Sequence, residues 1–214
     1  MPASIPVTDL TICQAALTLI GMPIITSLTD TGDSETLCNL HYPLLKRSVL
    51  SSYNWPFAIN QVRLAIDATE VPLTQYTNAF QLPSDRLYDD PLLAVLDTAE
   101  GASPFTDFEI QDEHLHTNQG EIYIWYLSKD GEIEDKWPEF FIDFIIHALA
   151  ARLAMPLTER VDLFTLYDDI AWGDSRTRQV PGGLYAKARS RSFQDKPPIR
   201  FESFELILAR HGGL

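Results

Sequence analysis

The feature that most constrains the fold is segment 140–153, which would place apolar side chains on almost every side of a helix. Such a helix must be buried on most sides, because a face left in water would expose a large apolar area. We therefore expect other helices to enclose it. Asp135 is a suitable N-cap with Pro138 in the first turn, and Met155-Pro156 is expected to end the helix. The side chains expected to make the packing contacts are Phe140, Phe144, Ile145, Leu149 and Leu153.

Two helices are expected before this segment. The first begins at a cap formed by Thr8 or Asp9 and runs to about Ile20, with Gly21 just past its end. The second covers about 35–51, where Pro43 would remove a backbone N–H and kink or restart the helix. Its apolar stripe consists of Leu37, Leu40, Leu44 and the Val49/Leu50 pair.

A fourth helix is expected after Pro156, with Thr158 as its cap. One of its faces is acidic, because it carries Asp162 and Asp169. The opposite face is apolar at helical spacing and consists of Val161, Phe164, Tyr167, Ile170 and Ala171.

Between the second and third helices the helical period disappears. Residues 58–66 alternate in polarity as a strand would, and so do Phe108 with Ile110 and Ile122 with Ile124. The sequence Asn118-Gln119-Gly120 predicts a short hairpin turn in which the glycine has positive φ. We interpret this segment as a small, mostly antiparallel β module.

These segments predict an α+β fold that is mainly α: a four-helix bundle with an inserted antiparallel β module and an extended C-terminal tail. The expected boundaries place residues 1–54 and 131–180 in the bundle and residues 55–130 in the β module. Residues 181–214 are expected to form an extended basic arm, because Pro181-Gly182-Gly183 ends the helical pattern and no sustained period follows it.

The charge of the chain is unevenly distributed. The net charge is −14, yet residues 176–214 contain eight Lys/Arg and three Asp/Glu, a balance of +5, which leaves −19 for the first 175 residues. So acidic a body repels phosphate backbones and argues against ordinary nucleic-acid binding. The basic tail mixes cations with aromatic rings, which is typical of a segment that orders on a partner; the alternative is a disordered, solvated terminus. The residues expected in this docking arm are Arg189, Arg191, Phe193, Arg200, Phe201, Phe204 and Arg210.

No catalytic or cofactor site is indicated by the sequence. It contains no nucleophile elbow, phosphate loop or dinucleotide fingerprint, and most of its carboxylates fall in polar turns or on exposed helix faces. His114 and His116, with Asp112 nearby, are a conceivable metal half-site, but no third strong ligand stands at a recognisable spacing, and an exposed hairpin edge is favoured. Asp143 and His147 are spaced to hydrogen-bond to each other, or each could bond across a subunit boundary, and a satisfied pair in the core is favoured. We therefore expect no catalytic residue, no metal and no cofactor.

Cellular location is addressed by two observations. Cys13 and Cys38 both fall in helix-like apolar patterns, which favours a buried pair of reduced thiols over a disulfide. Segment 140–155 is the most apolar one, but polar residues such as Asp143 and Arg152 interrupt it, so we expect it to be too short and too polar to span a membrane. These features predict a soluble protein made in a reducing cytoplasm.

The order of the segments resembles the tail tubular protein A family, the head-to-tail adaptors of bacteriophages. The likeness covers roughly residues 10–172 and rests on five pieces in the same order. They are residues 17–24 (LTLIGMPI), residues 42–58 ending in Trp55-Pro56-Phe57-Ala58, residues 76–85 with Leu82-Pro83-Ser84-Asp85, residues 116–126 ending in Ile122-Tyr123-Ile124-Trp125-Tyr126, and residues 148–167 beginning with Ala148-Leu149-Ala150-Ala151. Residues beyond Gly182 have no counterpart in this resemblance.

The resemblance implies a structural virion protein. Members of that family look like helical bundles with an inserted β module, arranged as a twelve-fold ring beneath the portal protein. It implies that this chain assembles in the host cytoplasm into the neck of the virion, contacts the portal, other copies of itself and a distal tail or nozzle protein, and lets DNA pass without specific binding. It implies no catalytic residues and no membrane partner. A neighbouring subunit in such a ring is expected to pack on the apolar third helix.

Two alternatives stay open at this point. A tail-associated polysaccharide or peptidoglycan hydrolase would use two of the carboxylates as acid and base. A cytoplasmic interaction module would have no role in a virion.

Overall fold

The computed structural model describes residues 6–72, 75–87, 91–96, 104–174 and 182–195, and these residues form two compact units. The helical unit contains the described residues up to Phe57 and those from Gly131 to the end of the described chain. The β unit contains the described residues of Ala58–Asp130. Over its described residues, the chain therefore leaves the helical unit once and returns to it, and the fold is α+β with an inserted β unit, as expected.

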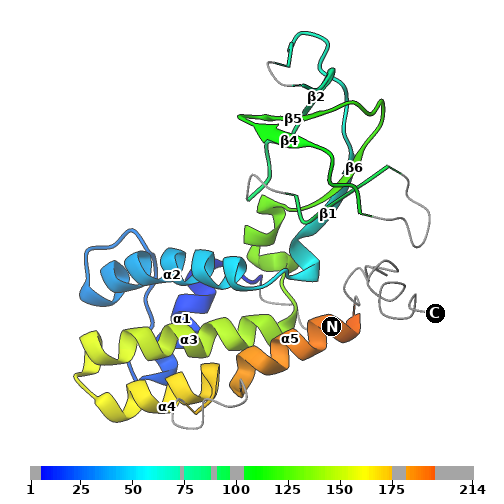
Figure 1. Ribbon diagram of the computed structural model, residues 1–214. Coiled ribbons are helices and arrows are strands. Elements are labelled where there is room, and N and C mark those ends of the chain that lie inside the picture. Colours follow the sequence, from blue (N-terminus) through cyan, green and yellow to red (C-terminus); the bar gives the residue numbers. More distant parts are fainter. Residues whose placement is uncertain (1–5, 73–74, 88–90, 97–103, 175–181, 196–214) are drawn as a thin grey trace, which may run out of the picture. The chain divides into compact units, whose positions relative to one another are not determined.

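The helical unit is organised around one enclosed helix. Its helices are α1 (Asp9–Leu19), α2 (Asp33–Ser52), α3 (Glu139–Thr158), α4 (Val161–Trp172) and α5 (Gly183–Asp195), and the other four pack against α3 (Figure 1). The expectation that other helices enclose this segment is confirmed. Of the expected packing residues, Phe140 is half-buried, and the fully buried ones are Phe144, Ile145, Leu149 and Leu153.

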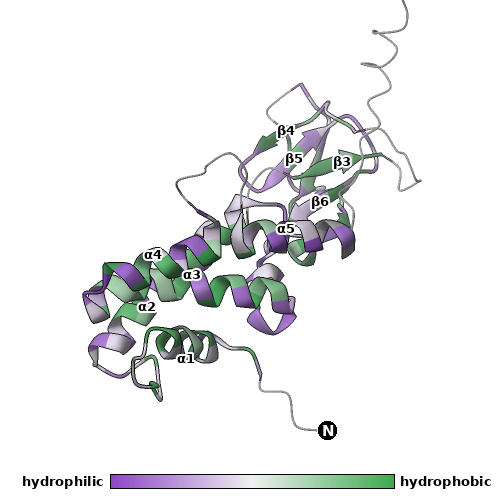
Figure 2. Cartoon of the chain, turned by 90° about the horizontal axis from the view of Figure 1, so that it is seen from below, coloured by the Kyte–Doolittle hydropathy of each residue, from purple (hydrophilic) through white to green (hydrophobic). Residues whose placement is uncertain are grey.

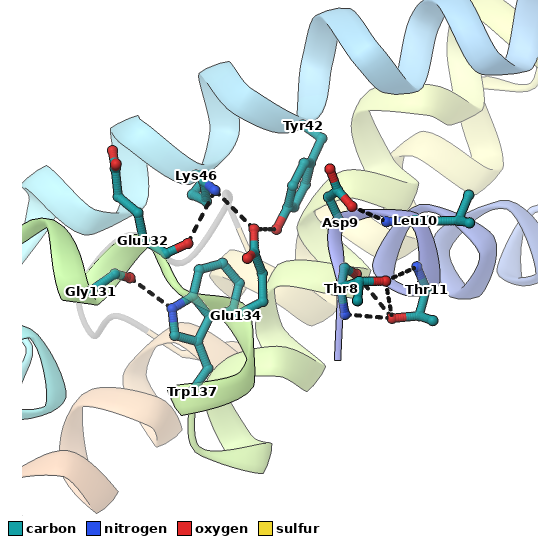
Figure 3. A network of polar contacts seen from close by, with 10 residues as sticks. All are labelled: Thr8, Asp9, Leu10, Thr11, Tyr42, Lys46, Gly131, Glu132, Glu134 and Trp137. Atoms are coloured by element: carbon teal, nitrogen blue, oxygen red, sulfur yellow. Dashed lines mark hydrogen bonds and ion pairs between the residues drawn. The ribbon is translucent and has the colours of Figure 1, made fainter. Parts of the chain in front are cut away.

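The first helix begins and ends where the sequence predicts. The Thr8 hydroxyl accepts a hydrogen bond from the Thr11 backbone N–H at 3.2 Å, and the Thr11 hydroxyl accepts one from the Thr8 backbone N–H at 2.8 Å (Figure 3). This reciprocal pair satisfies two donors that a helix start leaves without partners. Gly21 follows the helix with a φ of +78°, a conformation that glycine adopts without steric cost.

Both predicted ends of the third helix are wrong. Asp135 lies in a 3₁₀ turn, Glu134–Lys136, and Pro138 is the N-cap instead. The helix also continues through Pro156 to Thr158, since a proline in the last turn removes a single backbone hydrogen bond while the segment before it stays packed. Thr158 does not cap the fourth helix, because its hydroxyl donates to the Ala154 carbonyl at 2.6 Å; the N-cap of α4 is Arg160.

The buried side of α2 differs from the predicted stripe. The helix runs through Pro43 without a break, and it buries Cys38, Tyr42, Leu45, Val49 and Leu50. Leu40 and Leu44 are 55% and 52% exposed, so the prediction is wrong for these residues. Both sets of residues recur at helical spacing, and periodicity alone does not tell which of two apolar stripes meets the core.

The α4 prediction fails in a similar way. Ala171 is the only buried residue of that helix, Tyr167 and Ile170 are half-buried, and Val161 and Phe164 are exposed. The expected apolar face therefore covers the core with its C-terminal half alone.

The β unit consists of two antiparallel sheets of three short strands each. The strands are β1 (Ile59–Arg63), β2 (Asn78–Gln81), β3 (Leu93–Val95), β4 (Glu109–Gln111), β5 (His114–Thr117) and β6 (Tyr123–Leu127), in the orders β1-β6-β3 and β2-β5-β4. One apolar core serves both sheets, and it contains Leu64, Phe80, Leu82, Ala94, Leu115, Ile122, Ile124 and Tyr126.

The predicted hairpin at 118–120 is wrong, because β5 and β6 belong to different sheets and Gly120 does not have positive φ. The tight turn lies instead between β4 and β5, where Asp112 has a φ of 52°. The Asn118 side-chain oxygen accepts a hydrogen bond from the Thr77 backbone N–H at 3.0 Å. This contact holds the 118–120 segment at the start of β2. The chain then continues from the β2-β5-β4 sheet into β6 of the other sheet.

The segment after 181 is not an extended arm over its described part. Residues Gly183–Asp195 form α5, which packs against α3 and α4 and buries Ala188 and Ser192. Small residues at a spacing of four let this helix approach its neighbours closely, although it is the most hydrophilic of the described helices (Figure 2). Residues 196–214 of the predicted arm lie outside the described residues.

The prediction that segment 140–155 is too short and too polar to span a membrane is also wrong. Helix α3 has 20 residues and is long and apolar enough to cross a bilayer by length and composition. Core helices pass the same test, and ten α3 residues are buried within this chain.

Candidate interaction surfaces

The paired histidines of β5 do not form a metal site in the described part of the chain, where no group of three or more His, Cys, Asp and Glu side chains is placed to hold an ion. The His114 ring pairs with the Asp67 carboxylate at 3.2 Å, and the ring of His116 is 6.4 Å from that of His114. His116 is buried, and no described residue hydrogen-bonds to its ring nitrogens. The predicted exposed hairpin edge is therefore wrong for His116.

Several carboxylates have shifted pKa values that trace to local contacts. Hydrogen bonds from Thr69 and His114 lower the pKa of Asp67 to about 2. Burial and the neighbouring Asp169 raise the pKa of Asp168. The predicted Asp143–His147 contact exists, since His147 Nδ1 lies 2.8 Å from the Asp143 carbonyl oxygen and 3.4 Å from its carboxylate, but Asp143 is exposed.

Cys13 and Cys38 are free, buried thiols, as predicted. They belong to α1 and α2, and a hydrogen bond from one thiol to the other, together with burial, raises the pKa of the Cys13 thiol. The thiol of Cys13 therefore stays protonated at neutral pH.

A polar network fixes the start of α3 (Figure 3). The ammonium group of Lys46 on α2 donates to the Glu134 carboxylate at 2.8 Å and to the Glu132 carbonyl at 3.2 Å. The Tyr42 hydroxyl donates to the same carboxylate at 2.8 Å. Burial alone would raise the pKa of Glu134, but these hydrogen bonds outweigh it and the pKa lies below its ordinary value. The indole N–H of Trp137 donates to the Gly131 carbonyl at 2.8 Å, which adds a second contact to the turn before α3.

Aromatic rings anchor α5 in the helical unit. The Tyr185 ring contacts Phe144 and Trp172 at centroid distances of 5.3 and 5.2 Å, and it reaches Trp55 at 6.1 Å. Its hydroxyl lies 3.0 Å from the Ser52 hydroxyl. These contacts hold α5 against the end of α2 and against α3 and α4.

Arg189 belongs to the same anchor. Its guanidinium lies over the Tyr53 ring at 4.7 Å and near the Tyr185 ring at 5.6 Å. Such cation–π contacts engage the charge of Arg189 with rings of the helical unit, although its side chain is exposed. Lys187 and Arg191 are exposed on α5 and present their charge outward.

The structure therefore separates the residues predicted for the docking arm. Arg189 and Arg191 lie on α5; Phe193 belongs to that helix, but its side chain lies outside the described ones. The remaining predicted arm residues, Arg200, Phe201, Phe204 and Arg210, lie outside the described residues.

Sequence reasoning missed the ring contacts of Tyr185, Trp172 and Trp55. A signal was present, because Leu184, Tyr185, Ala188 and Ser192 recur at helical spacing, but the many polar residues between them obscured it.

Two helices, α2 and α4, carry apolar side chains on their outward sides. On α2 the exposed apolar residues are Leu40 and Leu44, and the half-buried Leu37 precedes them. On α4, Val161 and Leu166 are 59% and 50% exposed. We call these residue sets, with the charged residues between or beside them, the α2 face (Leu37, Leu40, Leu44 and Arg47) and the α4 face (Val161, Asp162, Leu166 and Asp169).

A scan against protein-family models and a search of curated proteins found no match to this chain.

Proposed function

We propose that this protein is a structural subunit of a bacteriophage neck, a head-to-tail adaptor that docks on the portal protein, assembles with copies of itself into a ring and continues the DNA channel toward a distal tail protein. The observation that carries the proposal is the architecture. The described segments before and after the β unit form a helical bundle, and the β unit is inserted between the second and third helices. This is the arrangement that the resemblance of residues 10–172 implies. Because a fold does not determine a function, the proposal needs further support from surfaces and charge.

The charge distribution supports the role. The balance of −19 over residues 1–175 gives a ring of such subunits a wall that repels DNA phosphates. DNA can then pass without being held by the channel. The same charge keeps free subunits apart until contacts with the portal compensate for the repulsion.

The described part of the basic C-terminal region supports portal docking through a folded helix, α5, in place of the extended arm that was predicted. Lys187 and Arg191 project from a folded helix, whereas the charge of Arg189 is engaged by Tyr53 and Tyr185. A preformed helix binds with a smaller loss of conformational entropy than a disordered arm does. We therefore assign portal contact to the outward side of α5, together with whatever residues 196–214 add.

The proposal is tested by mixing the purified protein with the portal protein encoded in the same gene cluster. We expect ring-shaped complexes in electron micrographs. The double variant Lys187→Glu/Arg191→Glu should bind the portal at least about tenfold more weakly, with a smaller dependence on salt, because two cation contacts are reversed. Arg63→Glu is the matched control, since Arg63 is exposed and pairs with Glu121, and it should bind as the unaltered protein does.

Absence of any complex at saturating concentrations would overturn the adaptor role. Turnover of peptidoglycan or glycan that one Asp→Asn or Glu→Gln change abolishes would favour the hydrolase instead.

A further inference from the structure

The enclosure of α3 means that a neighbouring copy must be met elsewhere. The third helix was expected to serve both the bundle and a neighbouring subunit, yet α1, α2, α4 and α5 cover it within one chain. We infer that successive copies of this chain contact each other through the α2 face of one copy and the α4 face of the next. The inference rests on the proposed ring and names the surfaces that build it.

The α2 face is a stripe with a cation at one end. Leu37, Leu40, Leu44 and Arg47 are three or four residues apart, so they lie on one side of the helix, opposite the buried Cys38, Tyr42, Leu45 and Val49. Arg47 is exposed and has no ion-pair partner among the residues that the structure describes. The face therefore offers leucine side chains and one available positive charge.

The α4 face has the opposite charge. Asp162, Leu166 and Asp169 follow each other at helical spacing, and Val161 adjoins them. Asp162 already pairs with Arg160, whereas Asp169, the half-buried second carboxylate of this face, has no ion-pair partner among the described residues. This face therefore offers apolar area beside an available negative charge.

The charges select the pairing. Two α2 faces placed together would give neither Arg47 a carboxylate of the opposing face, and two α4 faces would set acidic residues against acidic residues, so neither symmetric pairing matches opposite charges. An α2 face against an α4 face buries leucines and valine against each other and matches Arg47 with Asp169.

The position of the two faces then determines the type of assembly. Within the helical unit, α2 and α4 pack on different sides of α3 (Figure 1). A contact between two different faces is heterologous, and when it is repeated it leads from copy to copy around a closed ring or along an open filament. A subunit built this way needs no symmetric dimer as an intermediate.

The contact is tested by oxidative cross-linking at high protein concentration in about 1 M salt, where the Debye length is about 3 Å and repulsion between the acidic subunits is screened. The native thiols of Cys13 and Cys38 are fully buried, so introduced cysteines dominate the reaction. The double variant Leu44→Cys/Leu166→Cys should give a ladder of multimers on a non-reducing gel. A mixture of the two single variants should stop at dimers, and each single variant alone should stay monomeric.

A matched control is Leu44→Cys combined with Ser190→Cys, since Ser190 is exposed on α5. It should cross-link at least about tenfold more slowly than the first pair if proximity controls the rate. In about 0.1 M salt, Arg47→Glu should slow the Leu44–Leu166 cross-link about fivefold, and Asp169→Lys in the same chain should restore it.

A ladder no stronger than the control, dimers from Leu44→Cys alone, or no rescue by Asp169→Lys would each overturn the inferred contact. The test is separate from that of the proposed function. A ladder without portal binding would leave this contact standing and overturn the adaptor role, whereas portal binding without a ladder would do the reverse.

Discussion

The helices α3 and α4 follow each other with two residues, Glu159 and Arg160, between them, and both are rich in apolar side chains. Yet α3 buries ten residues, whereas α4 buries Ala171 alone. The difference lies in how the apolar residues are distributed. They surround α3, so any side left open would be costly, but on α4 they share the helix with aspartates that keep one side in water. Distribution around the axis, more than apolar content, decides which helix becomes the core.

The largest expected effect comes from the same substitution made in each helix. Leu149→Ala removes a fully buried side chain from α3 and should lower the free energy of unfolding by about 3–5 kcal/mol. Leu166→Ala removes a half-exposed side chain from α4 and should cost less than about 1 kcal/mol. Urea denaturation followed by circular dichroism measures both. Equal losses would show that α4 belongs to the core as much as α3 does.

The next largest loss of stability is expected from the charged pair before α3, which is compared with the charged pair at the start of α4. The side chains of Lys46 on α2 and Glu134 before α3 are 19% and 17% exposed, so Glu134→Gln should cost about 1–3 kcal/mol at pH 7 by leaving a partly buried cation without its counter-charge. The pKa of Glu134 is lowered in the folded protein, so its contribution is present above the unfolded pKa of about 4.3 and is lost as the pH falls through the folded value. The gap between the two proteins should therefore close at acid pH.

The matched change at the start of α4 is Asp162→Asn. Asp162 forms an exposed pair with Arg160, and such pairs contribute little in water, so no shift of the denaturation midpoint is expected. A shift as large as that of Glu134→Gln would contradict the contrast between the two helix starts.

Apart from the Asp162→Asn control, the smallest effect concerns the junction between α3 and α4. Glu159 has a φ of 56°, a left-handed conformation that favours glycine, and its backbone N–H closes the end of α3 on the Met155 carbonyl. Glu159→Gly should stabilise the protein by about 0.5–1 kcal/mol by removing strain, whereas Glu159→Ala should not. Differential scanning calorimetry resolves the two variants. A lower melting temperature for the glycine variant would show that backbone entropy outweighs strain at this junction.

The sequence predicted the fold correctly wherever a residue pattern is compatible with one structural interpretation. The enclosed third helix, the caps of α1 with Thr8 and Gly21, and the inserted antiparallel unit follow from periodicity and turn chemistry. The buried thiols of Cys13 and Cys38 followed in the same way.

The predictions were wrong where the sequence allowed two structural interpretations that are physically equivalent. On α2, Leu40 and Leu44 formed as regular a stripe as Cys38 and Tyr42, and only contact with α3 decides between them. At the C-terminal end, α5 is held by the rings around Tyr185, which are far apart in the sequence. The surfaces on α2 and α4 were not predicted, because exposure depends on which side the core selects.

The placement of α3 after the β unit has a consequence for synthesis on the ribosome. Both α1 and α2 pack mainly on α3, yet the chain from Ser52 to Glu139 must be translated before that helix exists. At the usual speed of elongation, this delay is on the order of ten seconds. During that interval the nascent leucines and thiols of the first two helices have no core to enter, so chaperone occupancy should peak there and fall once residue 158 has left the exit tunnel.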